Sequence, residues 1–224
     1  MLRQLADDLW VFDHPLKLSG AEFGTRTTVV RLGDGGLFVH SPGPVATTPT
    51  AELEALGPVR CLVAPNKLHY FFVAENLAAF PDAELYLAPG LQQKRAELPA
   101  GHELGDEPAA LWEADLAQVR TRGSTFMEEV VFFHAASRTL LLTDLAFNFG
   151  RPKGLATRIV LGMTGAIEHF GPSRLARLTM RDRKAMRASI DRILEWDFDR
   201  VSLTHGDVLE SGGREALRGA YAFL

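Results

Sequence analysis

Several side chains that can bind a metal ion stand at the ends of apolar runs in the sequence. They are His40 in "GLFVHSP", His69 in "CLVAPNKLHY", Asp144 in "TLLLTDLAF" and His205 in "RVSLTHGD". The ends of buried strands are rigid mounts for ligands, and imidazole together with carboxylate suits zinc, iron or manganese. Charged and imidazole groups directly after apolar strands risk burial and then need partners. Their joint occurrence therefore predicts that these residues form one cluster.

Each of these residues also has a simpler interpretation when it is taken alone. A single histidine at the end of a strand is more often a hydrogen-bonded loop residue than a metal ligand. Asp144 can equally cap the turn that follows it, because aspartate side chains bond to backbone N–H groups nearby. Only the position of the elements around these residues separates the two interpretations.

The composition is that of an ordinary globular protein, with 224 residues of which 46% are hydrophobic and 23% charged. We expect one domain over residues 1–224, made of two packed halves. The formal net charge of -4 gives no reason to expect nucleic acid or an anionic membrane as partner. The start, "MLRQLADDLWVFD", has acids where a secretory signal has its apolar stretch, and the lone Cys61 excludes an intrachain disulfide. We therefore expect a cytoplasmic protein.

The elements that must position the candidate ligands alternate between strand and helix, which is the pattern of a layered α/β domain. Apolar and β-branched runs predict strands within residues 8–14, 25–32, 37–44, 59–65, 83–89, 116–123, 128–150 and 198–205. Helices are predicted within residues 48–57 and 73–79, and from a capping box of Thr179 with Asp182 onward. Residues 150–178 show no clean period and carry no assignment.

The order of these segments resembles the metallo-β-lactamase-like superfamily, a four-layer αββα sandwich whose members include glyoxalase II-type thioester hydrolases. The resemblance covers roughly residues 8 to 210. "APNKLHYFFVAENL" stands where the superfamily has H-x-H-x-D-H and a helix, and "GGLFVHSPGP" stands where it has a strand ending in Asp-Thr-Gly. "EEVVFFHAASRTLLLTD" looks like its hairpin with a bridging aspartate, and "VSLTHGD" looks like its last ligand strand. The degenerate pattern resembles a branch that is a domain of unknown function.

The departures from the superfamily pattern are as informative as the matches. Lys67 stands at the first histidine of the motif, and Phe71 and Phe72 replace its aspartate and last histidine. Three superfamily ligands carry over by position, namely His69, Asp144 and His205, and His40 replaces an aspartate near the metal site. The resemblance therefore implies one zinc, iron or manganese ion, or none, in place of the usual two-metal site.

Two functions follow from this pattern. In the first, the metal ion serves a hydrolase of a small ester or thioester, with Glu129, or Glu128 beside it, as the carboxylate that moves a proton. Lys67 is the second candidate catalytic residue. In the second, the chain is a metal-free scaffold or ligand-binding protein. There an internal pair of Lys67 and Asp144 replaces the metal's charge, and the two phenylalanines fill the ligand space. The partner is a small-molecule substrate if the chain is active, and the sequence does not set the oligomeric state.

Overall fold

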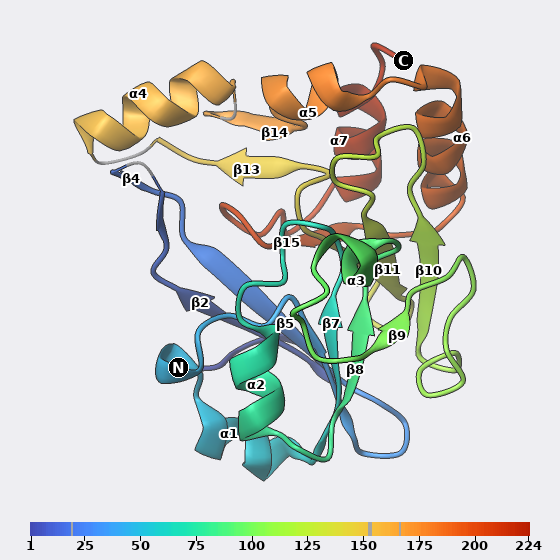
Figure 1. Ribbon diagram of the computed structural model, residues 1–224. Helices are drawn as coiled ribbons and strands as arrows, with labels where there is room; N and C mark the ends of the chain where they lie inside the picture. The colour runs from blue at the N-terminus through green and yellow to red at the C-terminus, as the bar shows by residue number, and fades with distance from the viewer. Residues whose placement is uncertain (19, 152–153, 166) are drawn as a thin grey trace.

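Two β-sheets lie face to face in the computed structural model, which describes residues 1–224 except 19, 152–153 and 166 (Figure 1). The N-terminal half of the chain builds the larger sheet, in the order β1-β2-β5-β6-β7-β8-β9. Its strands are Arg3–Ala6 (β1), Leu9–His14 (β2), Thr25–Arg31 (β5), Leu37–His40 (β6), Val59–Ala64 (β7), Glu84–Leu87 (β8) and His102–Glu103 (β9). A turn at residues 33–36 joins β5 to β6, closed by a bond from Leu32 N–H to the Gly36 carbonyl.

The second sheet has the order β10-β11-β12-β15. Its strands are Leu116–Arg120 (β10), Val130–His134 (β11), Thr139–Leu142 (β12) and Arg200–Leu203 (β15). The hairpin predicted within residues 128–150 is β11 and β12, which pair in antiparallel fashion. Two small ribbons complete the strands: Lys17–Leu18 (β3) with Ala21–Glu22 (β4), and Phe147–Phe149 (β13) with His169–Gly171 (β14).

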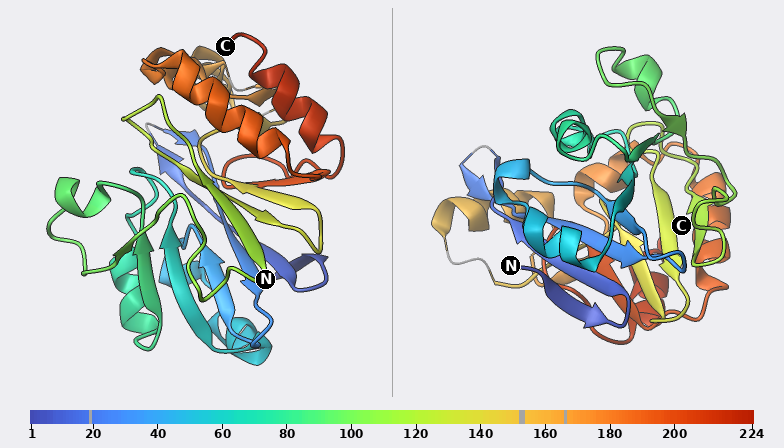
Figure 2. Two further views of the ribbon diagram at one scale, coloured as in Figure 1. Left: turned by 90° about the vertical axis from the view of Figure 1, so that its right-hand side faces the viewer. Right: turned by 90° about the horizontal axis from the view of Figure 1, so that it is seen from below.

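Helices cover the outer faces of both sheets, as Figures 1 and 2 show. The larger sheet carries Thr50–Leu56 (α1) and Val73–Ala79 (α2), with the short Val45–Thr47 (η1) and Leu91–Lys94 (α3) beside them. The second sheet carries Arg183–Leu194 (α6) and Gly213–Ala220 (α7), and Leu155–Thr164 (α4) and Arg174–Thr179 (α5) run along one edge of the molecule. The layers are therefore helix, sheet, sheet, helix, as the sequence predicted.

Three apolar layers hold this arrangement together. Between the sheets, Phe38 packs against Phe132 and Trp112, with ring centroids 5.1 and 5.2 Å apart. The outer face of the larger sheet packs on α1 and α2 through residues such as Leu53 and Val73. The other outer layer includes the helix residues Met186, Ile190 and Ile193, which form the apolar face of α6. Burial of this apolar surface is the main favourable term in folding.

Parallel pairing brings the strand ends that carry the candidate ligands to one edge. β6 pairs with β7 in parallel, and β12 pairs with β15 in parallel with Leu142 opposite Leu203. Asp144 lies two residues after Leu142, and His205 lies two residues after Leu203. Because parallel strands in register finish at the same level, the sheet itself sets these two side chains next to each other.

The segment without a sequence assignment, residues 150–178, contains α4, β14 and α5. The capping box also needs correction: Thr179 is the last residue of α5, and Asp182 alone caps α6 by accepting a bond from Ala185 N–H at 2.9 Å. None of the described helices combines the length and the apolar character that are needed to cross a membrane.

Candidate metal centre

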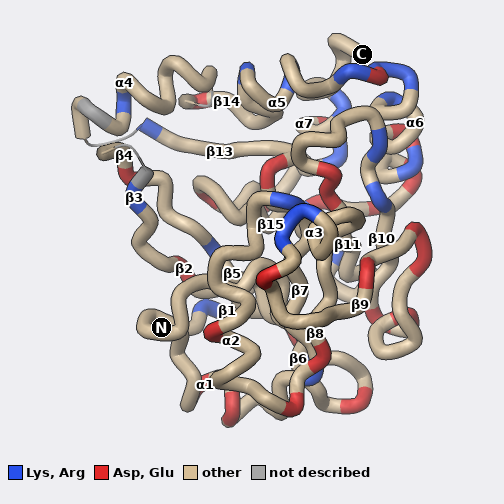
Figure 3. The backbone as a smooth tube through the Cα atoms, in the orientation of Figure 1, with Lys and Arg blue, Asp and Glu red and all other residues tan. Residues whose placement is uncertain are grey.

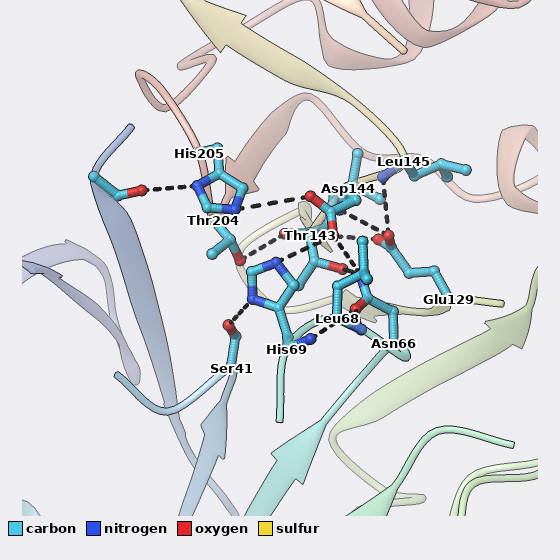
Figure 4. Close-up of polar contacts among 12 residues, drawn as sticks. Ser41, Asn66, Leu68, His69, Glu129, Thr143, Asp144, Leu145, Thr204 and His205 are labelled. Carbon is cyan, nitrogen blue, oxygen red and sulfur yellow. Dashed lines mark hydrogen bonds and ion pairs between the residues drawn. The ribbon is translucent and has the colours of Figure 1, made fainter. Parts of the chain in front are cut away.

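Three of the four candidate ligands meet at the edge where the parallel strands end (Figure 4). His69, Asp144 and His205 each offer one ligand atom, and these atoms lie within 4.8 Å of one another. His69 Nε2 is 3.2 Å from Asp144 Oδ2, and His205 Nε2 is 3.7 Å from Asp144 Oδ1. The side chains are 11%, 8% and 8% exposed, so the group lies at the surface of the core and is still reachable from outside.

The orientation of His205 is set by a backbone carbonyl. Its Nδ1 is 2.8 Å from the carbonyl oxygen of Gly24. A carbonyl can only accept a hydrogen bond, so Nδ1 carries the proton and Nε2 keeps its lone pair. Arg26 fixes the same turn, because its Nη1 donates to the carbonyls of Leu203 and Gly206 at 2.9 and 2.8 Å. His205 is thus prepared to give its Nε2 lone pair to a ligand.

His69 is held by two residues from different segments. Its Nδ1 is 2.9 Å from the Ser41 hydroxyl, which follows β6, and its backbone N–H donates to Asn66 Oδ1 at 2.9 Å. Asn66 Oδ1 also accepts the backbone N–H of Leu68 at 2.8 Å, a turn of the kind that asparagine side chains form with their own loop. The loop after β7 therefore has one shape, which aims Nε2 of His69 at Asp144.

Asp144 lies in a turn that is held by hydrogen bonds with Asn66 and Glu129. Asn66 Nδ2 donates to Asp144 Oδ2 and to the Thr143 hydroxyl, both at 2.8 Å. Glu129 accepts the backbone N–H groups of Thr143 at 2.7 Å, Asp144 at 2.8 Å and Leu145 at 2.9 Å. Glu129 was expected to carry a proton. The structure shows a buried carboxylate that accepts three backbone N–H bonds and so positions the turn of Asp144.

The charges in the centre favour metal binding over protonation. Burial alone would raise the pKa of Asp144. The imidazoles of His69 and His205 and the bond from Asn66 outweigh it and hold that pKa at about 2. Burial lowers the pKa of His205 to about 4, against the opposing effect of Asp144. For Glu129, burial and the neighbouring Asp144 raise the pKa. Near neutral pH the centre therefore presents an ionised carboxylate beside a neutral imidazole of His205.

His40 does not join the other three ligands. It lies on the same face of β6 as Phe38, which is the face that packs between the sheets, and its ring is 5.7 Å from that of Phe132. Burial, with His69 nearby, lowers its pKa to about 3. Within the described part of the chain neither ring nitrogen of His40 has a hydrogen-bond partner. The four-ligand cluster expected from the sequence is therefore a cluster of three, with His40 buried apart from it.

Lys67 and the two phenylalanines also differ from their expected places. Lys67 Nζ pairs with Glu128 and not with Asp144, so the internal pair expected for a metal-free scaffold is not formed. Phe71 is 70% exposed and stacks on Tyr70, and Phe72 precedes α2, where its carbonyl accepts a bond from Asn76. Phe71 therefore does not fill the space of a lost ligand.

The donor set fits a divalent transition metal ion. Two imidazoles and one carboxylate are the ligand types that zinc and iron prefer, and three protein ligands leave a position open for a reactant. Ligating histidines usually bond through their second nitrogen to a fixed partner. His69 and His205 both do so, through Ser41 and the Gly24 carbonyl. The residues that would hold an ion are thus His69, Asp144 and His205.

Sequence reasoning missed the residues that hold the ligands in place, chiefly Asn66, Ser41 and Arg26. Asn66 directly follows Pro65 at the end of β7, and a short polar residue after a strand is a weak signal of a turn. Ser41 has a φ of +54°, a conformation that its sequence gives no reason to expect. Arg26 reaches the last strand from a position far away in the chain, which no local pattern can show.

A cavity of about 470 Å³ opens beside the centre. Gly24, Thr204 and Gly206 line it, and these are the residues that bind or flank His205. Its other walls include the apolar Phe23, Phe149 and Leu161 and the cationic Arg26, along the inner side of α4 and β13. Four further charged residues line it, namely Asp13, Glu22, Arg151 and Asp207, so the cavity combines an apolar wall with strongly polar ones.

Comparison with known proteins gives a family by sequence and a fold by structure. Residues 6–153 match the family model described as a domain of unknown function (DUF4336). No curated protein matches the sequence significantly. The structure of DIM-1 metallo-beta-lactamase exposed to ceftazidime is similar with 14% identity and a TM-score of 0.70, over 100% of this chain and 96% of that one.

Two further solved structures give the same picture. A metallo beta lactamase from Erythrobacter litoralis, with beta mercaptoethanol in its active site, has 14% identity, a TM-score of 0.71 and coverage of 100% and 96%. The Flv1 flavodiiron core from Synechocystis sp. PCC6803 has 12% identity and a TM-score of 0.67, over 100% of this chain and 60% of that one. At such low identity the likeness concerns the fold, and it confirms the predicted αββα sandwich of metallo-β-lactamase type.

Proposed function

Because the chain belongs to the family described as a domain of unknown function, DUF4336, and folds as a metallo-β-lactamase, we propose that it is a metal-dependent hydrolase with a mononuclear centre. The observation that carries this proposal is the convergence of His69, Asp144 and His205, with the Nε2 lone pair of His205 left free by the Gly24 carbonyl. The substrate class is a small ester or thioester.

The chain's own residues set the conditions for this chemistry. A zinc, iron or manganese ion, when bound, supplies a Lewis acid and lowers the pKa of a water molecule. Asp144 stays ionised and His205 stays neutral near pH 7, so neither has to lose a proton before it can bind. Asn66 and Glu129 hold the Asp144 turn rigid, which fixes the ligand geometry without taking part in proton transfer.

The cavity beside His205 supports a small substrate with an apolar part. Phe23, Phe149 and Leu161 can cover the acyl chain or the thiol side of such a molecule, because they form one apolar wall. Thr204 and Gly206 lie on both sides of His205 along this wall. A substrate in the cavity would therefore lie next to His205, whose Nε2 lone pair is left free by the bond to the Gly24 carbonyl.

A metal-free scaffold is the second candidate, and one observation favours it. Asp144 already has partners in the absence of an ion, since His69 Nε2 and Asn66 Nδ2 both contact its Oδ2. A buried carboxylate with such partners is tolerated without a metal. In this form of the hypothesis His69, in place of Lys67, is the internal partner of Asp144.

Metal analysis separates the two candidates. On the hydrolase proposal, purified protein holds about one transition metal ion per chain. His69→Ala and His205→Ala each lose most of it, whereas the matched control His102→Ala keeps it, because His102 is exposed on β9. Wild-type protein that stays metal-free after incubation with zinc, iron and manganese would overturn the hydrolase proposal and favour the scaffold.

Activity is tested on the same proteins. Small thioesters and esters are offered to metal-loaded wild type, and release of free thiol or alcohol is followed. The expected result is turnover that is lost after chelation, restored by one of the three metals and absent in His205→Ala. Metal-loaded protein that hydrolyses none of these substrates would show that the centre serves another reaction.

A further inference from the structure

A second pocket, of about 410 Å³, lies apart from the cavity beside His205. It is bounded by the loop after β7, the end of α3, the loop between β10 and β11 and the end of α5. We call it the basic pocket, and its lining residues are Lys67, Lys94, Thr125, Phe126, Leu178, Thr179 and Arg181. Three of these are cations and none is an acid, in a chain whose net charge is -4.

The positive charge of the basic pocket is only partly neutralised by its surroundings. Lys67 is ion-paired with Glu128, whose carboxylate also contacts Arg120 outside the pocket lining. Lys94 Nζ lies 6.0 Å from the ring centroid of Phe126. Among the ion pairs found between described residues, none involves Lys94 or Arg181. Figure 3 shows Lys and Arg beside α3 and along α6.

The same pocket exposes apolar surface. Phe126 is 42% exposed and Leu178 is 82% exposed, and both lie among the cations. Large apolar side chains left in water next to incompletely neutralised charges favour a ligand that has both an anionic and an apolar part. Three cations around one hollow match a doubly charged oxyanion better than a single carboxylate, because each terminal oxygen can meet a donor.

We propose that the basic pocket binds a phosphate-type oxyanion carried on a small apolar or aromatic body. Lys67, Lys94 and Arg181 meet the oxyanion, and Phe126 with Leu178 covers the apolar body. The site goes beyond the proposed hydrolase, because it needs no metal ion and shares no residue with the metal centre. It also gives Lys67 a role that neither sequence-based hypothesis contained.

Calorimetric titration of chelator-treated protein tests this site without interference from the metal centre. The probes are phenylphosphonate, methylphosphonate and benzyl alcohol, each at the same ionic strength in chloride. Phenylphosphonate is expected to bind, methylphosphonate to bind about tenfold more weakly for want of the aromatic contact, and benzyl alcohol not to bind. Equal affinity for all three probes, or no binding of phenylphosphonate, overturns the proposal.

Variants then locate the site. Lys94→Met and Arg181→Met are each expected to weaken phenylphosphonate binding by about tenfold; both residues are exposed, so the fold is kept. The matched control Lys184→Met removes an exposed charge from α6 outside the pocket lining and should bind like wild type. Phe126→Ser should erase the preference for phenylphosphonate over methylphosphonate. If the first two variants bind as wild type does, the oxyanion lies elsewhere and the proposal fails, while the metal proposal is untouched.

Discussion

Asn66 connects the two ligand-bearing loops of the metal centre through one side chain. Its Oδ1 shapes the loop of His69, and its Nδ2 reaches Asp144 and Thr143 on the other sheet. Residues that orient metal ligands from behind are typically worth a factor of ten or more in metal affinity. Among the residues outside the ligand set, Asn66 is therefore the one whose loss should weaken metal binding most.

Asn66→Ala is expected to weaken metal binding by about 10- to 100-fold and to lower the free energy of unfolding by about 3 kcal/mol, because buried partners lose their bonds. Competition with a chelating dye measures the first effect and urea unfolding the second. The control is Asn76→Ala, which removes a buried asparagine bonded to the Gly43 and Phe72 carbonyls. It should lose similar stability and keep its metal. Equal loss of metal in both variants would contradict the role given to Asn66.

At the scale of elements, the residues that follow β15 are in close contact with β13. Gly206 has a φ of +92°, and an added Cβ there would overlap the carbonyl of Asn148 at β13. Gly212 has a φ of +71°, but an added Cβ there would meet open space. The two glycines thus share a backbone conformation that favours glycine and differ in their surroundings.

Gly206→Ala is expected to lower the free energy of unfolding by about 3 kcal/mol, since conformational strain adds to the overlap with β13. Because His205 precedes this glycine, the variant should also bind less metal. Gly212→Ala carries the strain alone, at about 1 kcal/mol, and should keep the metal affinity of wild type. Thermal unfolding and metal titration of both proteins check this, and equal destabilisation by the two changes would count against the close contact.

Stability of the whole molecule should depend on pH through a histidine that is not among the candidate ligands. Burial lowers the pKa of His14 to about 4, although Asp13 acts in the opposite direction. Its ring is held by the hydroxyls of Thr47 and Thr27, at 2.5 and 3.1 Å. Above pH 6.5 the ring is neutral in both folded and unfolded chains. As the pH falls from about 6.5 to about 4, only the unfolded chain takes up the proton, so stability is lost across this window.

The loss from His14 should be about 3 kcal/mol, and it should level off below pH 4, where the folded chain is protonated as well. Urea unfolding between pH 7.5 and 4 measures it. His14→Gln keeps a polar group near both threonines and should flatten the curve by that amount. His102→Gln changes an exposed histidine and should leave the curve as it is. An unchanged slope in His14→Gln would show that the proton uptake belongs to other groups.

Local patterns predicted most of the strands, and the family resemblance predicted the layer order. The sequence also placed His69, Asp144 and His205 in one cluster, but it wrongly added His40 to them. Apolar runs such as Cys61–Ala64 make buried strands, and Gly-rich turns join them. The position of His40 also follows from the alternation along its strand. Residues two apart share a face, and Phe38, two residues before His40, is a core residue. Contacts between side chains far apart in the sequence were not predictable. Neither the ion pair of Lys67 with Glu128 nor the bonds from Glu129 to the Asp144 turn follow from spacing.

The three ligands come from both sheets, with His69 after β7 and the other two after β12 and β15. An ion shared among them would act as a crosslink between distant parts of the chain. Closing long loops in the unfolded chain costs entropy that a preformed link removes. Metal occupancy should therefore govern how cooperatively the two halves of the molecule unfold, and the centre would matter to the protein's lifetime even where no substrate is present.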